Sequence, residues 1–519
     1  MNATDIVIAY HERSKHAPSR YAASLGYMDW ATQPNPYRSY EGTQKIVLPL
    51  AFDNATPSYH LLDIPDAIPA APYCKESIAQ FFQFSLGLSA YKRHGDQGWA
   101  LRCNASSGNL QPSEAYLIAP SFDSNAISVS HYGPEHHHLE TLATFESDFF
   151  KSLPEGSFLI GLSSIAWREA WKYGERSFRY CQLDAGHALH ALQISAQTLG
   201  WKIQRLSPEI EDLDTLLGFN QKARFFPNER EDADMLLLIT PESVSAIDIK
   251  PLLEYLPKQF EGIVNQLSHQ HHPWDVLETI NDITHTNLDA QKPFVPLTQH
   301  IKAPSQSAKD IILKRRSAQV MDKYNATISY EQFIALMDSV SGNLEHFENS
   351  VHLIVYVHKV TTLASGLYIL VRNPKHLEKL QAHLHADFEW KVIEEGLYFL
   401  KEDNYRFSAK NISCTQDIAS DGAFSLGMLT HFKEELEIYG PARYKELYWE
   451  CGVIGQQLYL EATSLGLSAT GIGCYLDDMM HTMIGLKDNT FQSLYHFTIG
   501  RGIVDTRLTM EQPYQNRET

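Results

Sequence analysis

A run of small polar residues, Ser106-Ser107-Gly108-Asn109, has the composition of a ligand-holding loop. Loops of this kind present backbone N–H groups and short hydroxyls. Gly108 permits close backbone approach, and Asn109 offers both a donor and an acceptor. The run can therefore wrap the polar parts of a flat cofactor. Composition alone also suits an ordinary surface turn, because serine, glycine and asparagine are the common turn residues.

Predicted elements frame this loop. Apolar positions from Glu76 to Leu88 predict a buried helix ahead of it, and the run from Ala115 to Ile118 predicts a strand after it. Further along, WKYGERSFRY pairs Lys172 with Tyr173 before an amphipathic helix from Leu183 to Leu199. The same patterns predict helices at 139–149, 311–317, 330–339, 423–437 and 450–465, and strands at 127–129, 158–165, 235–240 and 351–357.

Composition narrows the class of protein. The 519 residues suggest two or three domains, and 43 basic against 62 acidic residues give a net charge of −19. That charge argues against nucleic acid or an anionic membrane as the main partner, because both need a positive field. The sequence has neither a stretch of about 18 apolar residues nor a signal-like start, so we expect a cytoplasmic protein.

Cysteine and histidine are the residues that invite a metal interpretation. The six cysteines are scattered without a C-x-x-C pair, which favours reduced thiols over a disulfide framework or a zinc site. The histidine runs at 136–138 and 269–272 lie in polar stretches without supporting carboxylates or cysteines. We therefore expect these runs to be solvated loops, and no metal site.

An internal repeat organises the chain. Residues 173–200 align without a gap with residues 439–466, and the match includes Tyr-Gly, an acid, an internal glycine and a final Leu-Gly. A shared helical period would reproduce the apolar stripe but not these residues at constant spacing. We therefore predict two fused copies of one fold, which typically pack as a pseudo-symmetric dimer.

Three segments resemble the flavin-dependent nitroreductase superfamily. They are KRRS (Lys314 to Ser317), SSGNLQP (Ser106 to Pro112) and ATSLGLSATGIGCYLDD (Ala462 to Asp478). YHERSK near the N-terminus, the whole loop RCNASSGNLQPSEAYL, and WKYGERSFRY are similar to SagB/ThcOx-type dehydrogenases, which oxidise azolines in peptide natural products. The resemblance covers most of the chain except a connector and the region 370–420.

The resemblance implies an α+β fold with two nitroreductase-like domains. Each has a mixed, largely antiparallel sheet flanked by helices, and the two pack as an intrachain pseudo-dimer. In that family FMN binds at the dimer interface, where arginines and a hydroxyl meet its phosphate. Lys172 and Tyr173 are implied as catalytic, serving proton transfer. The implied cofactor-binding residues are Arg315, Arg316, Ser317, Gln319, Arg102, Ser106, Ser107, Asn109, Gly471, Ile472, Gly473 and Arg507.

The two copies depart from the family pattern in complementary ways. The first has the serine loop but no Arg-Arg-Ser, whereas the second has Arg-Arg-Ser but only SVSGNLEHFENSV before its strand, with Ser341 to Leu344 as a candidate relic. We therefore predict one functional FMN site and one empty site. Gln319 stands where the family usually has a basic residue, and Arg102 and Arg501 are candidates to supply that charge.

These features predict an FMN-dependent oxidoreductase that moves a hydride to or from a small molecule or a peptide heterocycle. NAD(P)H is a candidate transient donor, because the sequence has no G-x-G-x-x-G loop for a resident nicotinamide. The alternative is a degenerate scaffold that binds a peptide or protein without redox chemistry. Lys172 and Tyr173 likewise suit a half-buried surface helix. We expect an arm (1–70), two domains (71–245 and 310–519) joined by a connector (246–309), and a chain that can be monomeric in solution.

Overall fold

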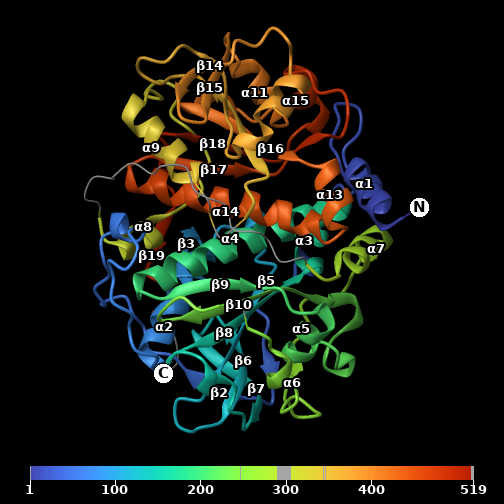
Figure 1. Cartoon of the computed structure of the whole chain (residues 1–519), viewed down its shortest axis with the longest axis vertical. Coiled ribbons are helices and arrows are strands. Elements are labelled where there is room, and N and C mark those ends of the chain that lie inside the picture. Colours follow the sequence, from blue (N-terminus) through green and yellow to red (C-terminus); the bar gives the residue numbers. More distant parts are fainter. Residues whose placement is uncertain (1, 246, 289–305, 343, 345–346, 516–519) are drawn as a thin grey trace. The chain divides into compact units, whose positions relative to one another are not determined.

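The computed structural model describes residues 2–245, 247–288, 306–342, 344 and 347–515 (Figure 1). The chain divides into two compact units. The N-terminal unit comprises Ser24–Ala290, Pro304–Leu313 and Thr506–Thr519, and the C-terminal unit consists mainly of Lys314–Asp505 together with Met1–Ala23. Within the expected connector, 246–309, residues 246 and 289–305 lie outside the described residues. Among the described helices, none is long and apolar enough to cross a membrane.

A seven-stranded antiparallel sheet forms the centre of the N-terminal unit, in the order β2-β7-β6-β5-β8-β10-β9. Helix α4 packs against strands of this sheet (Figure 1). The strands are β2 Gln44–Val47, β5 Ser113–Pro120, β6 Ile127–Gly133, β7 His138–Phe145, β8 Phe158–Ile165, β9 Lys202–Leu206 and β10 Glu231–Thr240. The helices are α2 Lys75–Gln83, α3 Ala166–Tyr173, α4 Ser177–Thr198, α5 Ile210–Leu217, α6 Lys250–Leu253 and α7 Asp275–Thr284.

The C-terminal unit has its own seven-stranded antiparallel sheet, in the order β14-β15-β13-β12-β16-β18-β17. Helices α9 and α14 pack together, and α14 lies against β17 and β18. The strands are β12 Val351–Val357, β13 Gly366–Leu370, β14 Lys391–Glu394, β15 Leu397–Glu402, β16 Phe424–His431, β17 Ser468–Ile472 and β18 Phe491–Gly500. The helices are α1 Ala3–Arg13, α9 Tyr330–Ser341, α10 Leu377–His383, α11 Arg406–Ile412, α12 Ile418–Asp421, α13 Lys433–Tyr439, α14 Arg443–Ser464 and α15 Asp477–Ile484, and α8 Ala308–Lys314 joins the units.

Six of the seven strands follow the same order in the two sheets, and the sheets differ at the edge, where β2 comes before all the others in the chain but β14 lies between β13 and β15. The repeat alignment matches equivalent helices. Helices α4 and α14 both contain 22 residues and begin and end at aligned positions. The glycines that end α3 and α13, Gly174 and Gly440, both have positive φ angles of 53° and 80°. Gly200 and Gly466, after the long helices, have φ angles of 68° and 70°. The repeated glycines are therefore needed for left-handed backbone at the helix ends.

Two expected helices are wrong. Residues 138–145 form strand β7, whose Glu140 faces the core because it pairs with His131 on β6. The expected helix 423–437 is strand β16 followed by helix α13. Every residue of β16 is buried, so the strand lacks the alternation of exposed and buried positions that would distinguish it from a helix.

The expectation of solvated histidine loops also fails in part. His137 is fully buried, with Nδ1 at 2.8 Å from the Tyr132 hydroxyl, and His138 is buried on β7. In the second run, His271 pairs with Glu229 at 2.8 Å. His137 and His271 thus have protein partners, which local composition does not disclose.

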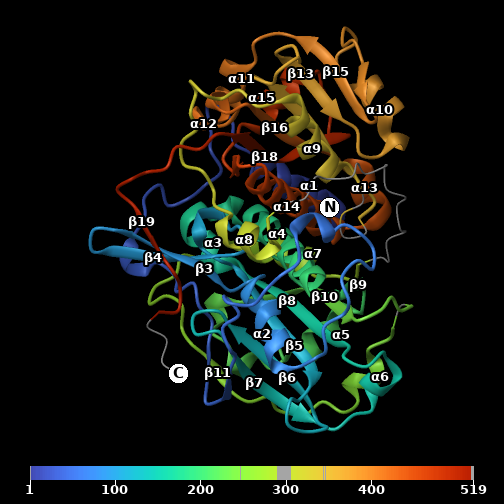
Figure 2. The same cartoon turned by 90° about the vertical axis from the view of Figure 1, so that its left-hand side faces the viewer.

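The chain ends are built into different units. Helix α1 packs in the C-terminal unit, where His11 contacts the Tyr444 hydroxyl and Gln492, each at 3.1 Å. The last strand, β19 (Thr509–Glu511), pairs with β3 (Leu88–His94) of the N-terminal unit, which in turn pairs with β4 (Gln97–Arg102) (Figure 2). A separate two-stranded sheet joins β1 (Tyr40–Glu41) to β11 (Ile263–Val264).

A buried charged network stabilises the N-terminal unit. His131 lies between Glu114 (3.0 Å) and Glu140 (2.9 Å), and Glu114 also pairs with Arg168 at 2.5 Å. Burial would lower the pKa of His131, but hydrogen bonds to the two carboxylates outweigh it and raise the pKa to about 9. His131 is therefore a cation in the folded protein at neutral pH.

This network predicts a loss of stability at alkaline pH. Because the folded pKa of His131 is raised above 6.5, its contribution is complete below pH 6.5 and is lost as pH rises through about 9. The free energy of unfolding of the N-terminal unit should fall by about 3 kcal/mol across this window. Urea unfolding at a series of pH values measures it. His131→Gln should be less stable throughout and should lack this slope, and equal slopes in the two proteins would contradict the assignment.

Candidate functional site

The serine loop is anchored by a buried acid on α4. The Ser107 N–H donates to both carboxylate oxygens of Asp184 at 3.0 Å, and the Ser107 hydroxyl donates to one of them at 2.9 Å. Burial raises the pKa of Asp184 to about 7. The hydrogen bonds from Ser106 and Ser107 act in the opposite direction and lower this pKa, but burial has the larger effect. The Ser106 hydroxyl accepts from the Gln111 N–H at 2.8 Å. The loop is thus a fixed part of the unit and more than a surface turn.

The predicted catalytic pair lies against this loop. Gly108 has a φ of 60°, and a Cβ there would stand 2.7 Å from the Tyr173 hydroxyl and 3.1 Å from Lys172 Nζ. Lys172 Nζ lies 5.2 Å from the centre of the Tyr173 ring, which packs on Tyr180 at 4.3 Å. The positive φ favours glycine at this position, and the Lys172 and Tyr173 side chains of α3 lie against the serine loop.

Arg102 and Asn109 line a cavity of about 530 Å³ in the same unit. The buried Arg102 donates from Nη2 to the Pro36 carbonyl at 2.6 Å and lies over the Tyr37 ring. Asn109 donates to the Ala100 carbonyl at 3.0 Å. Gln111 of the SSGNLQP segment also lines the cavity. The lining is rich in aromatic side chains, among them Tyr37, Tyr91, Trp99 and Tyr514, which were not predicted as site residues.

In the C-terminal unit, Tyr459 of α14 connects the arginine segment to the glycine segment. Its hydroxyl lies 2.8 Å from the Ser317 hydroxyl and accepts from the Gly471 N–H at 2.8 Å. The Arg315 guanidinium stacks over its ring at 5.3 Å. Sequence reasoning missed Tyr459, although it lies within the repeated helix.

The remaining predicted cofactor-binding residues belong to the arginine segment, to the glycine segment or to the C-terminal segment of the chain. Arg316 is half-buried and donates to the Arg315 carbonyl at 2.6 Å, while Gln319 is exposed. Gly471 and Ile472 end β17, followed directly by Gly473. Arg507 is exposed and belongs to the C-terminal segment of the other unit.

Comparison with known proteins identifies the fold. A model of the Nitroreductase family matches residues 364–501. A structure from Anabaena variabilis described as a nitroreductase aligns with a TM-score of 0.71 at 22% identity, covering 96% of this chain and 99% of that one. The chain has the nitroreductase fold. The predicted α+β class with two nitroreductase-like domains is thereby confirmed.

Two further solved structures match more weakly. A Ralstonia eutropha protein described as a nitroreductase aligns at 15% identity and a TM-score of 0.29, covering 42% of this chain and 99% of that one. The E. coli microcin synthetase McbBCD complex, solved with truncated pro-MccB17 bound, aligns at 16% identity with a TM-score of 0.27. The alignment covers 47% of this chain and 93% of that one. A comparison with curated protein sequences gives no match.

The family match corrects one expectation. Residues 370–420 were expected to lack the resemblance, yet all of them lie inside the matched segment 364–501. They include β14 and β15, which belong to the main sheet. Their pattern was obscured because these strands are short and partly exposed at the sheet edge.

The second nitroreductase-like domain uses the aligned acid in a similar way. Glu450, aligned with Asp184, accepts from the Ser350 and Val351 N–H groups at 3.2 and 3.4 Å. Gln111 and Asn349 each lie two residues before the equivalent strands β5 and β12, and both have a φ of 55°. Part of the expected relic at Ser341 to Leu344 lies outside the described residues. The repeated acid therefore holds the loop that leads into the strand in both domains.

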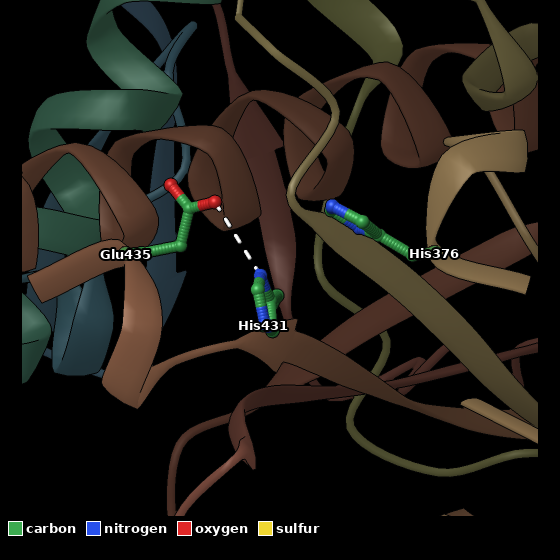
Figure 3. Close-up of side chains that lie close together, drawn as sticks. All are labelled: His376, His431 and Glu435. Atoms are coloured by element: carbon green, nitrogen blue, oxygen red, sulfur yellow. Dashed lines mark ion pairs between the residues drawn. The ribbon is translucent and has the colours of Figure 1, made fainter. Parts of the chain in front are cut away.

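A cluster of His376, His431 and Glu435 has ligand atoms within 4.8 Å of one another (Figure 3). The Arg372 N–H donates to His352 Nδ1 at 3.2 Å, and His352 Nε2 lies 3.0 Å from His376 Nδ1. Burial lowers the pKa of both imidazoles, to about 4 for His376, so they are neutral. His352 must then donate from Nε2 to His376 Nδ1, so this nitrogen of His376 already has a protein partner. We therefore assign a hydrogen-bonded network here.

Proposed function

We propose that the protein is an FMN-dependent oxidoreductase with one flavin site that takes groups from both nitroreductase-like domains. The observation that carries the proposal is the complementarity of two sets of residues. One domain unites the serine loop with Lys172 and Tyr173, and the other unites Arg315 and Ser317 with the Gly471 backbone. Each set alone lacks what the other supplies.

The donor chemistry of these residues fits FMN. Guanidinium and hydroxyl groups at Arg315, Arg316 and Ser317 suit a phosphate dianion. Gly108 has no side chain, so the Lys172 and Tyr173 side chains can lie directly against the serine loop. Ser106, Ser107, Asn109 and the 471–473 backbone would meet the ring. Arg102, Gln319 and Arg507 are proposed to support the site.

A bound flavin supplies hydride transfer, and the protein supplies position and protons. Lys172, beside the Tyr173 ring and against Gly108, would take or return a proton at Nζ. Tyr173 would orient that ammonium and donate from its hydroxyl. Asp184 holds the loop by accepting the Ser107 N–H, so the loop N–H groups keep one direction.

For the substrate, we propose a SagB-type dehydrogenation of a small-molecule or peptide heterocycle, because the lysine–tyrosine pair accompanies the serine loop. Reduction of nitro compounds or quinones with NAD(P)H is the second candidate within the same chemistry. A scaffold that binds a peptide or protein without redox chemistry is the competing class. We further propose that two fused copies with the domain limits given above form an intrachain pseudo-dimer, cytoplasmic and monomeric in solution.

The flavin content of the freshly purified chain tests this proposal. About one FMN per chain, released by heat and counted by absorbance, is the expected result. Two per chain would contradict the single site. None, even after addition of FMN, would overturn the oxidoreductase and favour the scaffold.

Replacement of Lys172 tests the proton-transfer role. With a synthetic thiazoline-containing peptide as probe, Lys172→Ala should lower the dehydrogenation rate about 100-fold or more while flavin content stays unchanged. Lys172→Arg keeps the charge but cannot readily release a proton, so it should be equally slow. If Lys172→Arg were active, only the charge of Lys172 would matter. If both variants were fully active, Lys172 would have no role in the reaction.

A further inference from the structure

Two cysteines distant in sequence meet in the C-terminal unit. The Sγ atoms of Cys414 and Cys474 are 2.7 Å apart, and both residues are half-buried. A disulfide bond is about 2.05 Å long, so a small rotation of these side chains separates the pair from a covalent link.

The backbone on both sides holds the two thiols in place. Cys414 and Thr415, just after α11, have φ angles of 53° and 61°, a left-handed conformation that side chains rarely adopt. On the other side, Leu476 donates its N–H to the Ile412 carbonyl at 2.7 Å, and Gln416 Nε2 donates to the Cys474 carbonyl at 3.2 Å. The approach of the sulfur atoms is therefore built into the turn.

The other four cysteines have different surroundings. Cys181 and Cys451 are buried, and burial raises the pKa of both thiols well above the usual range, which keeps them protonated and inert. Cys103 is buried with its sulfur 3.3 Å from the Gln83 carbonyl. Cys74 is half-buried beside a serine hydroxyl at 3.4 Å.

We propose that Cys414 and Cys474 are a redox-active thiol pair that closes to an intrachain disulfide by exchange with a small-molecule disulfide. One cysteine thiolate attacks the disulfide, forms a mixed disulfide and releases one small thiol. The second cysteine thiolate then attacks the mixed disulfide and releases the other small thiol. Two protein thiols are oxidised, one small disulfide is reduced to two thiols, and both thiol protons pass to the released thiolates.

The position of the pair suggests what closure controls. Cys474 follows directly on the Gly471–Gly473 segment, so a disulfide would tie that segment to the turn after α11. This consequence rests on the proposed flavin site, because the segment is one that we propose to meet the flavin ring. Closure itself depends only on the two thiols.

Equilibration of the full chain in glutathione buffers of increasing disulfide content tests closure. The mixture is quenched with acid, alkylated under denaturing conditions and digested. A cross-linked peptide joining Cys414 to Cys474 should accumulate, with the other four cysteines alkylated. Absence of the cross-link over the whole range, or separate glutathione adducts on the two residues, would overturn the proposal.

Matched variants keep the test independent of flavin binding. Cys414→Ser should leave Cys474 as a stable glutathione adduct, whereas Cys74→Ser should close like the wild type. FMN is titrated separately into the closed and reduced chains. A cross-link in a chain that binds no FMN would uphold the thiol pair while rejecting the proposed function, and FMN binding without a cross-link would do the reverse.

Discussion

Replacing Arg315 and Ser317 together by alanine is expected to weaken FMN binding about 100-fold or more. Charge-assisted hydrogen bonds contribute about 1.5–3 kcal/mol each, and every 1.4 kcal/mol changes the dissociation constant tenfold. Arg315 is held over the Tyr459 ring, and Ser317 is held by the Tyr459 hydroxyl, so both groups are presented in one arrangement before the ligand arrives. Titration of the flavin-free chain with FMN, followed by flavin fluorescence, measures the effect.

Two controls separate ligand contacts from support of the fold. Lys323→Ala removes an exposed cation of the same unit and should leave FMN affinity unchanged. Tyr459→Phe keeps the ring under Arg315 but removes the hydroxyl that contacts Ser317 and accepts from Gly471, and should weaken binding less than the double variant. Unchanged affinity in the double variant would mean that the phosphate lies elsewhere.

Arg372→Ala should destabilise the C-terminal unit by about 3–5 kcal/mol. Arg372 is fully buried and its Nη1 pairs with Glu450. It also donates from Nε to the Val340 carbonyl at 2.6 Å and from Nη2 to Asn349 Oδ1 at 3.1 Å. Removing the guanidinium leaves a buried carboxylate and several acceptors unpaired. Urea unfolding, followed by tryptophan fluorescence, measures the change.

A double-mutant cycle assigns this loss to the ion pair. Arg372→Ala combined with Glu450→Gln should be more stable than the sum of the single variants predicts, because the uncompensated charge is gone. Lys433→Ala, which breaks an exposed pair with Glu437, should change stability by less than about 1 kcal/mol. If Arg372→Ala lowered the free energy of unfolding as little as Lys433→Ala, the buried ion pair would not be a major source of stability in this unit.

Much of the local structure follows from local pattern. The strand at 351–357 coincides with β12, and the helix expected at 330–339 lies within α9. The helices expected at 183–199 and 450–465 coincide with most of α4 and α14, although both observed helices begin earlier in the chain. These elements were predictable because their apolar period, caps and glycines act over a few residues.

Pattern failed where a distant residue decides the environment. Glu140 looks exposed in the sequence but lies in the core because His131 on the neighbouring strand is there to pair with it. The acid of the repeat, Asp184, was recognised as shared, but its hold on the Ser107 N–H depends on packing of α4 against the loop. The contact between Asp184 and Ser107 cannot be found from sequence spacing, because 77 residues separate the two.

Residue types and short-range periodicity were thus sufficient for the internal repeat and for many of the helices and strands. The resemblance to nitroreductases added the α+β plan and singled out the serine loop, the Arg-Arg-Ser segment and the lysine–tyrosine pair. Packing between distant segments decided the rest. It set Gly108 against Lys172 and Tyr173, placed Tyr459 between the two segments of the other domain, and brought Cys414 to Cys474. The physical reason is that helix and strand preferences come from neighbouring residues, whereas a site arises from burial and contacts between elements whose separation along the chain carries no signal.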